Sequence, residues 1–568
     1  MGNFVSFVRE KIGTKSNFFF IFGLALLCWF FYFNGLGDYR LIDIDETRYI
    51  NIAQNMFYSK DYITPYLNFE PFLEKPPLFY WLVILSYKIF GVVDNFTSRL
   101  PLAISATFGV FTIYFFVLNI VKSRICAFLS ALILMSSFWY ALFAHIGIMD
   151  LGFSVLTMAA FCFGTLTLFV DNVWKKRILW YLGYFFLALS VLQKGLIGII
   201  VPGGSLLITF LILKKAKEII KPSHIIPGVL IFLMIAAPWH YLVYKANGEI
   251  WFREYILKHH FARFVDSSMG LNRKRPLLFY IPVILGGIMP YTFVLVAAII
   301  KWAKYAIKTV RNAKTVKPLF SADTDDRKLV LISAVWFFVI FLFFSVSSTK
   351  LPTYILTAFP PLSILIGYFM WGYIKEEKNK KYVEISAIIT FLIFMISGIF
   401  GAWFYLSGNI NVGLPLAVLF AVFPVFGFIF LKFKQRIWLF GVFIALSFSL
   451  CAVNSSALFN FVTSFGQNEI EEYAQFVNGK KEDTKLVTFD FSKKYSILNY
   501  YKKNKVIYLL GSKDVLYSEF NRVLKEAKLN KETVYIILRN KKISGYSPEF
   551  LKMLKQVKKD KKYSLYRI

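Results

Sequence analysis

The chain has 568 residues, of which 57% are hydrophobic and 19% aromatic, and its formal net charge is +32. A soluble protein of this length would not carry so many apolar residues, and repeated uncharged runs of about 20 residues are typical of helices that cross a bilayer. Most Lys and Arg residues lie between these runs. We therefore attribute the positive charge to basic loops that orient the protein in the membrane and interact with anionic lipids. We expect no nucleic-acid partner.

The apolar runs predict a polytopic α-helical membrane protein with about thirteen transmembrane helices. The loops between them fall into a basic set and a short, mostly uncharged set, and the positive-inside rule places the basic set in the cytoplasm. The N-terminus is then inside and the C-terminus outside. The predicted spans are residues 17–35, 98–120, 125–143, 148–170, 177–192, 195–214, 224–244, 277–299, 328–348, 353–373, 382–406, 413–431 and 436–456.

One further apolar stretch, residues 77–92, is too short to cross comfortably and contains Lys88. We interpret it as an interfacial helix, which keeps the basic N-terminus inside. The two long external loops are then residues 36–97 and 245–276, and residues 300–327 are a basic cytoplasmic linker.

From about residue 462 the pattern changes. Residues 486–490, 506–509 and 534–538 have the composition of strands, and residues 514–528 have helical spacing. The sequence therefore predicts a transmembrane domain over residues 1–461 and a small α/β domain over residues 462–568 on the outer side of the membrane.

Charged residues at the outer ends of the spans are the candidates for chemistry, because the sequence has no nucleotide-binding loop and no hydrolase or metalloprotease motif. Asp45 and Glu46 follow the first span. Because they are adjacent, we expect one to face a substrate while the other pairs with Arg48. A solvated turn is the alternative interpretation.

Two further charged positions lie at the outer surface. Lys75 precedes Pro76 and Pro77, which stiffen the chain, so it is a candidate phosphate ligand. Glu74 and Lys75 are alternatively a pair that reaches to the lipid headgroups. Asp150 begins a span, where a carboxylate either faces a wet cavity or simply interacts with the helix dipole.

The second external loop is rich in cations and aromatic rings, a composition that suits a phosphate or an anionic lipid. It contains His260 and Arg263. One histidine together with Glu74 is a candidate site for a divalent ion. Tyr354, at the outer break between two spans, is either a donor to a phosphate oxygen or an ordinary interfacial tyrosine.

Six stretches in register resemble the glycosyltransferases of the C fold that use lipid-linked sugars, a family related to the protein O-mannosyltransferases. The likeness is strongest to the aminoarabinose (lipid A) transferases. Where that family usually has Glu-His before its Arg-Phe pair, this chain has His259-His260. The stretches are Asp45–Tyr49, Phe72–Pro76, Gln193–Gly198 with Pro202-Gly203, His260–Phe264, Pro276–Tyr280 and Lys350–Leu356.

The resemblance implies an inverting glycosyltransferase that moves a single (amino)sugar from undecaprenyl phosphate to lipid A, or another lipid or glycan, at the periplasmic face of the bacterial inner membrane. It implies no nucleotide. It places Asp45 and Asp150 in the catalytic cavity, where we add Glu46 as a third candidate. It assigns Lys75, Arg263 and Tyr354 to the donor phosphate, with Arg48 nearby, and Glu74 and His260 to a metal.

Two other functions remain open at this stage. A flippase or transporter of polyprenyl lipids would need no transfer chemistry, but transporters usually show paired half-repeats and broken helices, and no clear internal repeat is visible. A glycosyltransferase with protein serine or threonine as acceptor keeps the same chemistry and changes only the second substrate.

Overall fold

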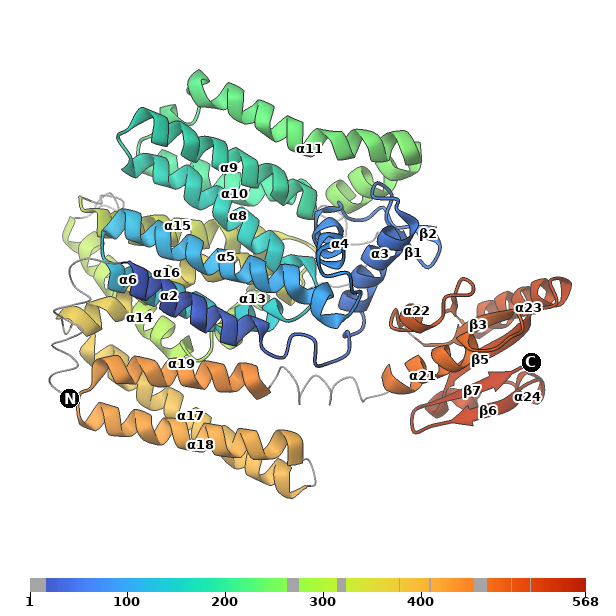
Figure 1. Ribbon diagram of the computed structural model, residues 1–568. Coiled ribbons are helices and arrows are strands. Elements are labelled where there is room, and N and C mark those ends of the chain that lie inside the picture. The colour runs from blue at the N-terminus through green and yellow to red at the C-terminus, as the bar shows by residue number, and fades with distance from the viewer. Residues whose placement is uncertain are drawn as a thin grey trace.

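The computed structural model describes residues 17–262, 275–313, 323–376, 378–407, 410–453, 467–491, 493–510 and 512–568. Figure 1 shows a bundle of helices that run side by side, and at one end of it a short helical segment and a smaller unit that contains a β-sheet. The predicted domain boundary at residue 461 falls outside the described residues and stays a prediction.

The bundle is built from helices joined by short turns. Three 3₁₀ turns, η2 (Thr167–Phe169), η3 (Ala216–Glu218) and η5 (Leu277–Phe279), and a longer one, η7 (Pro352–Ala358), lie between them. The helices are α2 (Phe18–Cys28) with the π-helical turn η1 (Trp29–Phe33), α5 (Asn95–Val121), α6 (Arg124–Ser136), α7 (Phe138–Ala144), α8 (Met149–Leu166), α9 (Val173–Lys194), α10 (Ile197–Ile212), α11 (Pro222–Trp251), α13 (Tyr280–Gly287), α14 (Thr292–Ala313), α15 (Asp325–Val346), α16 (Phe359–Glu376), α17 (Lys380–Leu406), α18 (Ile410–Lys432) and α19 (Arg436–Val453).

Six helices in the described part of the chain are long and apolar enough to cross a membrane, or seven if the bent pair α6 and α7 is one span. Six shorter apolar helices accompany them. The protein is therefore mostly helical and polytopic, whereas the predicted number of thirteen spans stays a prediction. The stretch predicted as an interfacial helix forms α4 (Leu78–Phe90). At 1.5 Å per residue it is about 20 Å long, which is less than the hydrocarbon core of a bilayer.

Two predicted segments differ from the structure. The span predicted over residues 277–299 is broken, because α13 ends at Gly287 and α14 starts at Thr292. Pro290 lies in the break, where it lacks an amide hydrogen and disfavours a helical residue before it. Helix α14 then continues to Ala313, so the first part of the predicted linker over residues 300–327 is helical.

The second predicted external loop, residues 245–276, is also helical in its first half. Helix α11 runs to Trp251 with a kink at Gly248, whose φ of 57° only glycine adopts readily. The π-helical segment η4 (Phe252–Ala262) follows. Composition alone did not reveal this, because the segment mixes charged and aromatic residues without a clean apolar stripe.

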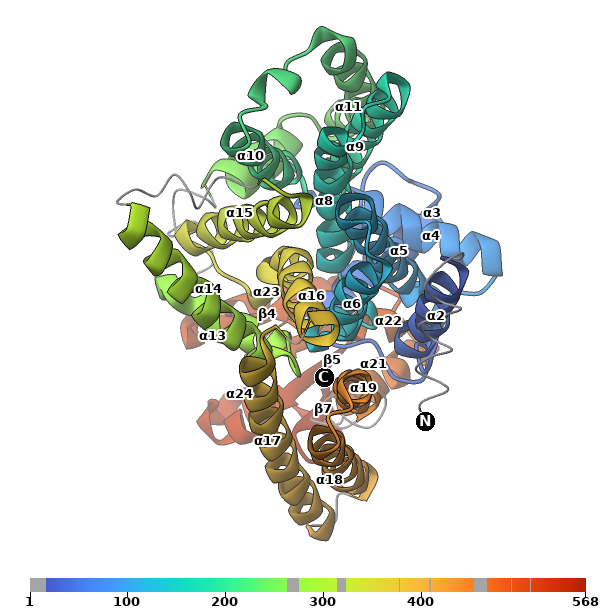
Figure 2. The ribbon, with the colours of Figure 1, turned by 90° about the vertical axis from the view of Figure 1, so that its left-hand side faces the viewer.

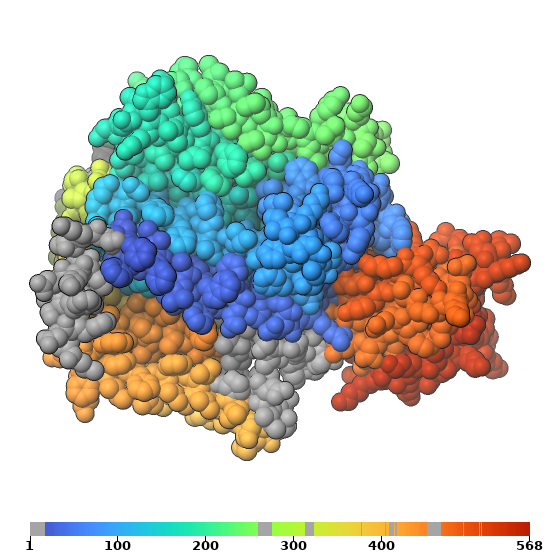
Figure 3. All heavy atoms as spheres, viewed as in Figure 1, coloured from blue at the N-terminus to red at the C-terminus, as the bar shows by residue number. Residues whose placement is uncertain are grey.

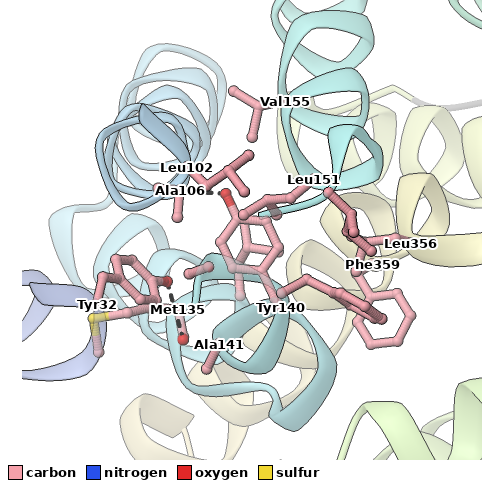
Figure 4. Packing of buried hydrophobic residues seen from close by; sticks show 14 of the residues in the cluster. Tyr32, Leu102, Ala106, Met135, Tyr140, Ala141, Leu151, Val155, Leu356 and Phe359 are labelled. Atoms are coloured by element: carbon pink, nitrogen blue, oxygen red, sulfur yellow. Dashed lines mark hydrogen bonds between the residues drawn. The ribbon is translucent and has the colours of Figure 1, made fainter. Parts of the chain in front are cut away.

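The centre of the bundle is packed around α5, α6, α8 and α16, as the view along the helices in Figure 2 shows. Helices α9, α10 and α11 lie on one side, and α17, α18 and α19 on the other. Buried tyrosines in this core satisfy their hydroxyls with backbone carbonyls (Figure 4). Tyr140 donates to Ala106 over 3.0 Å and Tyr32 to Met135 over 3.1 Å.

An external segment connects α2 to α5 and packs on one end of the bundle. It consists of α3 (Asp45–Ser59), the antiparallel pair β1 (Tyr66–Leu67) and β2 (Glu70–Pro71), and α4. Helix α3 begins with Asp45 and Glu46, whose charges suit the positive end of its dipole. Helix α5 begins with a capping box made by Asp94 and Thr97.

A buried ion pair fixes this segment to the bundle. Both side chains, Arg99 of α5 and Glu46 of α3, are fully buried. All five N–H groups of Arg99 are used: Nε and Nη2 donate to Glu46 over 2.7 and 3.0 Å, and the others to the carbonyls of Leu36, Tyr39 and Arg40.

The carboxylate of Glu46 is equally saturated. Its Oε1 also accepts from the amide of Gly147 over 2.6 Å, and its Oε2 from the amide of Ile42 over 2.7 Å. A Cβ at position 147 would meet Oε1 of Glu46 at 3.1 Å, so a glycine is needed for this close approach. Three chain segments are thus tied together by one carboxylate.

The C-terminal unit is a five-stranded sheet with helices, and the strand order is β4-β3-β5-β7-β6. Strand β3 is parallel to β4 and β5, whereas β7 is antiparallel to β5 and β6. Its elements are α21 (Gln467–Asn478), β3 (Thr484–Phe489), α22 (Ile497–Tyr500), β4 (Ile507–Leu509), α23 (Lys513–Leu529), β5 (Thr533–Arg539), η9 (Asn540–Gly545), α24 (Pro548–Lys552), β6 (Lys555–Lys559) and β7 (Tyr563–Arg567).

The three predicted strands and the predicted helix correspond to β3, β4, β5 and α23. Strands β6 and β7 were not predicted. Strand β6 is exposed along its whole length and has three lysines among five residues, so it lacks the apolar alternation that reveals a strand.

The C-terminal unit contacts the external segment directly (Figure 3), and polar side chains make the junction. Arg40 pairs with the buried Glu471 over 2.7 Å. Asp43 accepts hydrogen bonds from the backbone and the hydroxyl of Ser496 over 2.9 and 2.6 Å. Asn68 exchanges two hydrogen bonds of 2.8 Å with the backbone of Val506. The two parts of the chain are therefore joined next to α3.

Replacing Arg99 by methionine leaves Glu46 charged and buried without its partner. We expect Arg99→Met to lower stability by about 3–5 kcal/mol, because an uncompensated buried charge is costly. The measurement is thermal unfolding of the detergent-purified protein. Arg253→Met is the control, since Arg253 pairs with Glu249 at an exposed site and should change little. Equal melting temperatures of the two variants would contradict the structural role of the buried pair.

Candidate active site

The exposed edge of α3 carries the first group of site residues. The carboxylate of Asp45 is 58% exposed and forms an ion pair with Arg48, one helical turn later. The guanidinium of Arg48 lies 4.9 Å from the ring centre of Tyr49 and 5.8 Å from that of Tyr495. The predicted pairing of one carboxylate with Arg48 is confirmed, and Asp45 is the one that makes it.

The turn before α4 lies next to the Asp45–Arg48 pair. Glu74 and Lys75 are half-buried between β2 and α4. Burial alone would lower the pKa of Arg48, but the negative charges of its neighbours, which include Asp45 and Glu74, raise it above its ordinary value. Arg48 is therefore permanently charged in a place that is partly shielded from water.

A second cation–carboxylate pair lies at the ends of α8 and α9. Lys194 Nζ is 2.7 Å from Asp150 Oδ1, and both side chains are about nine-tenths buried. The same ammonium lies 4.4 Å from the ring centre of Tyr354 and 5.1 Å from that of Phe153. Three spans thus contribute to one polar cluster at the same end of the bundle as α3.

Local packing holds this second pair in place. The side-chain amide of Gln193 donates to the carbonyl of Met149 over 3.1 Å, which aligns the end of α9 with the start of α8. A Cβ at Gly152 would approach the Gln193 amide nitrogen to 2.8 Å, so the two helices come close because residue 152 has no side chain. Lys194 and Asp150 meet as a consequence.

Tyr49 links the two groups. It is buried, and burial raises the pKa of its hydroxyl, with Arg48 opposing the shift and Asp45, Asp150 and Glu74 adding to it. Its hydroxyl therefore stays protonated. The charges of α3, of the turn at Glu74 and of α8 all act on this one phenol. The arrangement presents positive groups for an anionic ligand and, beside them, two carboxylates for a cationic or developing positive charge.

The candidate residues do not all share one role. Asp45, Arg48, Glu74, Asp150 and Tyr354 belong to these linked clusters. Glu46 does not fit our prediction of a catalytic residue: it is fully buried and its four hydrogen-bond positions are occupied, so it holds the fold. No sequence pattern indicated this, because adjacent carboxylates look alike until the helix points them about 100° apart and packing buries one of them.

Two residues of the site were missed. Lys194 was noted only as part of a loop, and its partner Asp150 is 44 positions away. Tyr495 comes from the C-terminal unit, where burial raises the pKa of its hydroxyl while Arg48 works to lower it. No local sequence signal indicates either residue, because both reach the site through tertiary packing.

Lys75 is half-buried in the turn before α4, and two further candidates lie partly or wholly outside the described residues. Arg263 and the side chain of His260 lie outside the described residues, so their assignment to phosphate and to a metal stays a prediction. Within the described ranges, no group of three or more His, Cys, Asp or Glu residues is placed to hold a metal ion. The carboxylates of Asp45 and Asp150 already face cations, which does not favour a metal between them.

The chain is similar in sequence to several known proteins. The model of the dolichyl-phosphate-mannose-protein mannosyltransferase family matches residues 74–242. An uncharacterized protein of Aquifex aeolicus (strain VF5) is 30% identical over 387 residues, which cover 68% of this chain and 79% of the relative.

A named relative is an undecaprenyl phosphate-alpha-4-amino-4-deoxy-L-arabinose arabinosyl transferase of Proteus mirabilis (strain HI4320). It is 28% identical over 369 residues, which cover 65% of this chain and 62% of that protein. The match thus spans less than two thirds of the transferase.

A solved structure supports the fold over the whole length. ArnT from Cupriavidus metallidurans, crystallised with undecaprenyl phosphate, superimposes with a TM-score of 0.74 at 19% identity, over 97% of this chain and 98% of ArnT. Helical bundle, external segment and C-terminal unit therefore form a known fold, that of the membrane-embedded glycosyltransferases of the C fold. Within this class of enzymes, the chain belongs to the ArnT-like family.

Lys194 offers a direct test of the second cluster. We expect Lys194→Met to reduce glycosyl transfer by about 10²-fold, because a preorganised cation in a shielded site stabilises developing negative charge. Lys194→Arg should retain more activity than Lys194→Met. The measurement is transfer from a radiolabelled lipid-linked sugar in membranes. Lys221→Met, which breaks an exposed pair with Glu218, is the control. Full activity of Lys194→Met would remove this residue from the site.

Proposed function

We propose that the enzyme transfers a single amino sugar, aminoarabinose, from undecaprenyl phosphate to lipid A. The observation that carries the proposal is the meeting of two cation–carboxylate pairs, Asp45–Arg48 and Asp150–Lys194, around the buried Tyr49. The name of the Proteus mirabilis relative supports the sugar and its carrier. Lipid A as acceptor follows from the resemblance of the sequence stretches.

The reaction forms a bond between an acceptor oxygen and the anomeric carbon of the sugar, and it breaks the bond from that carbon to the donor phosphate. The phosphate leaves with the electron pair as undecaprenyl phosphate, and the anomeric configuration inverts. Negative charge grows on the phosphate during this step. Lys75, Arg263 and Tyr354 are the proposed phosphate ligands, and Arg48 and Lys194 add positive charge beside them.

The two carboxylates have different tasks in the reaction. A hydroxyl acceptor would need a general base, whereas a lipid A phosphate is already ionised near pH 7 and needs none. In the second case Asp45 binds the amine of the donor sugar and stabilises the positive charge that develops on the ring. Asp150, paired with Lys194, keeps that lysine oriented toward Tyr354.

The proposed location is the inner membrane, with the site on the periplasmic side. The basic loops, such as the one between α5 and α6, lie at the end of the bundle opposite to α3 and the C-terminal unit, as Figure 1 shows. The positive-inside rule supports a cytoplasmic position for those loops and a periplasmic one for the site. The carrier then presents the sugar outside, and no nucleotide is required.

A metal ion is not part of this proposal. Glu74 lies beside Arg48, and the proposed second ligand His260 has no described side chain. The residues described around Glu74 are the cation Arg48, the phenols of Tyr49 and Tyr495, and the carboxylate of Asp45, which is already paired with Arg48. Transfer by direct charge stabilisation therefore needs only the residues named above.

A protein acceptor is the second candidate function. The match to the protein mannosyltransferase family over residues 74–242 supports it, because that segment contains Lys75, Asp150 and Lys194. A flippase is disfavoured by membership in a glycosyltransferase family. The acceptor is thus the point at which the two candidates differ.

Mass spectrometry of lipid A decides between them. We expect lipid A from cells that express the enzyme to gain the mass of one amino sugar residue, and lipid A from deletion cells to lack it. Unchanged lipid A together with altered glycoproteins would replace the first proposal by the second.

The Asp45→Asn variant tests the role of the exposed carboxylate. It keeps the size of the side chain and removes its charge, so we expect transfer to fall by about 10²-fold with normal protein levels in the membrane. Glu249→Gln, at an exposed carboxylate paired with Arg253, should transfer normally. An Asp45→Asn variant as active as this control would exclude Asp45 from the mechanism.

A further inference from the structure

The sheet of the C-terminal unit has a topological switch point. The chain passes from β3 to β4 on one side, and then through α23 to β5 on the other side of β3. Where neighbouring connections leave a sheet in opposite directions, the carboxyl ends of the strands form the crevice in which α/β proteins bind ligands. Here the rule points to the region between the carboxyl ends of β3 and β5, which we call the crevice.

Cations gather at this crevice. Lys494 follows β3, Arg539 ends β5, Lys541 follows it, and Lys562 precedes β7. Arg539 is opposite Tyr563 in the strand register, and the amide of Asn540 donates to the carbonyl of Lys562 over 2.9 Å. The backbone thus holds the ends of β5 and β7 together. We call Lys494, Arg539, Lys541 and Lys562 the switch-point cluster.

The segment after β3 is brought onto the same edge. The rings of Phe491 and Tyr563 lie 5.1 Å apart. Lys542 is already paired with Asp490 over 2.9 Å, so it does not belong to the cluster. The carboxylate of Glu469, the acidic group that faces Lys562, accepts the backbone amides of Lys562 and Tyr563 over 3.1 and 2.9 Å.

The positive charges of the switch-point cluster are only partly offset by nearby carboxylates. Burial and then the charges of Arg539 and Lys494, with a further contribution from Lys541, lower the pKa of Lys562, and Glu469 opposes them only in part. Nε of Arg539 is buried and has no hydrogen-bond partner among the residues that the structure describes. A buried donor without a partner and several cations that repel one another would both be stabilised by a bound anion. These features are therefore typical of an anion-binding site.

The position of the cluster relates it to the active site. Lys494 Nζ makes a long ion pair, 3.9 Å, with the carboxylate of Asp43, which lies two residues before the start of α3. Tyr495, the next residue, contacts Arg48. The crevice therefore opens beside the site in which the sugar is transferred, and not on the distant side of the C-terminal unit.

We infer that the switch-point cluster binds a phosphate group of a lipid headgroup and so holds the acceptor glycolipid next to the catalytic residues. The inference rests on the proposed function for the identity of the acceptor, whereas phosphate binding itself does not. Four cations around one crevice suit a phosphomonoester, which has close to two negative charges and three acceptor oxygens.

The test compares two double variants of the full-length protein in nanodiscs. Arg539→Gln with Lys541→Gln removes two charges from the cluster. Lys525→Gln with Lys528→Gln removes two charges from the exposed end of α23, which leads into the opposite edge of the sheet. Binding of bisphosphorylated lipid A, dephosphorylated lipid A and phosphatidylglycerol is measured by native mass spectrometry. Transfer kinetics are measured with donor and acceptor varied separately.

We expect the cluster variant to lose about tenfold or more in affinity for bisphosphorylated lipid A, to raise the KM for the acceptor, and to leave the KM for the donor unchanged. The α23 variant and dephosphorylated lipid A should show no such loss. A parallel loss for phosphatidylglycerol would support the phosphate site with membrane lipid as its source. Equal behaviour of the two double variants would overturn the inference. If lipid A is never modified but phosphate-dependent binding persists, the proposed function fails while the site stands.

Discussion

The buried ion pair between Arg99 and Glu46 is the constraint on which the rest of the active end depends. Every hydrogen-bonding position of both groups is used, so the pair cannot be replaced by water or shifted without leaving a charge uncompensated. It joins the start of α3, the first turns of α5, the segment around Leu36 to Arg40 and the loop at Gly147. Asp45 and Arg48 owe their position to it, because they lie on the same first turns of α3.

Next to this buried ion pair, the cations and the carboxylates of the active site have different tasks. Arg48 and Lys194 are two cations of the site. Each is paired with one carboxylate and packed against aromatic rings. Rings shield the cations from water and leave their charge available, which strengthens their attraction for a phosphate. The paired carboxylates offset the positive charge of these two cations. The site can therefore accommodate both the departing phosphate and the positive charge that develops on the sugar.

The apolar helices and three of the five strands of the C-terminal sheet were predictable, because hydrophobic length and composition are local properties of the sequence. The break at Pro290 and the helical course of residues 245–262 were not, since a proline or a mixed segment permits several outcomes. One of the adjacent carboxylates Asp45 and Glu46 was predicted to pair with Arg48, and in the structure Asp45 makes this pair. The pairing of Lys194 with Asp150 and the approach of Tyr495 depend on tertiary packing, which no local pattern encodes. Glu46 was misjudged for the same reason: burial decides its role.

The junction between Asp43 and Ser496 has a consequence for biogenesis. The two residues are 453 positions apart, yet the second helps to seat the helix that presents Asp45. During synthesis the ribosome must finish the last tenth of the chain, and the translocation machinery must deliver it, before α3 has its final neighbours. A nascent or truncated enzyme would therefore hold an incomplete site, because Asp43 would lack its contacts with Ser496.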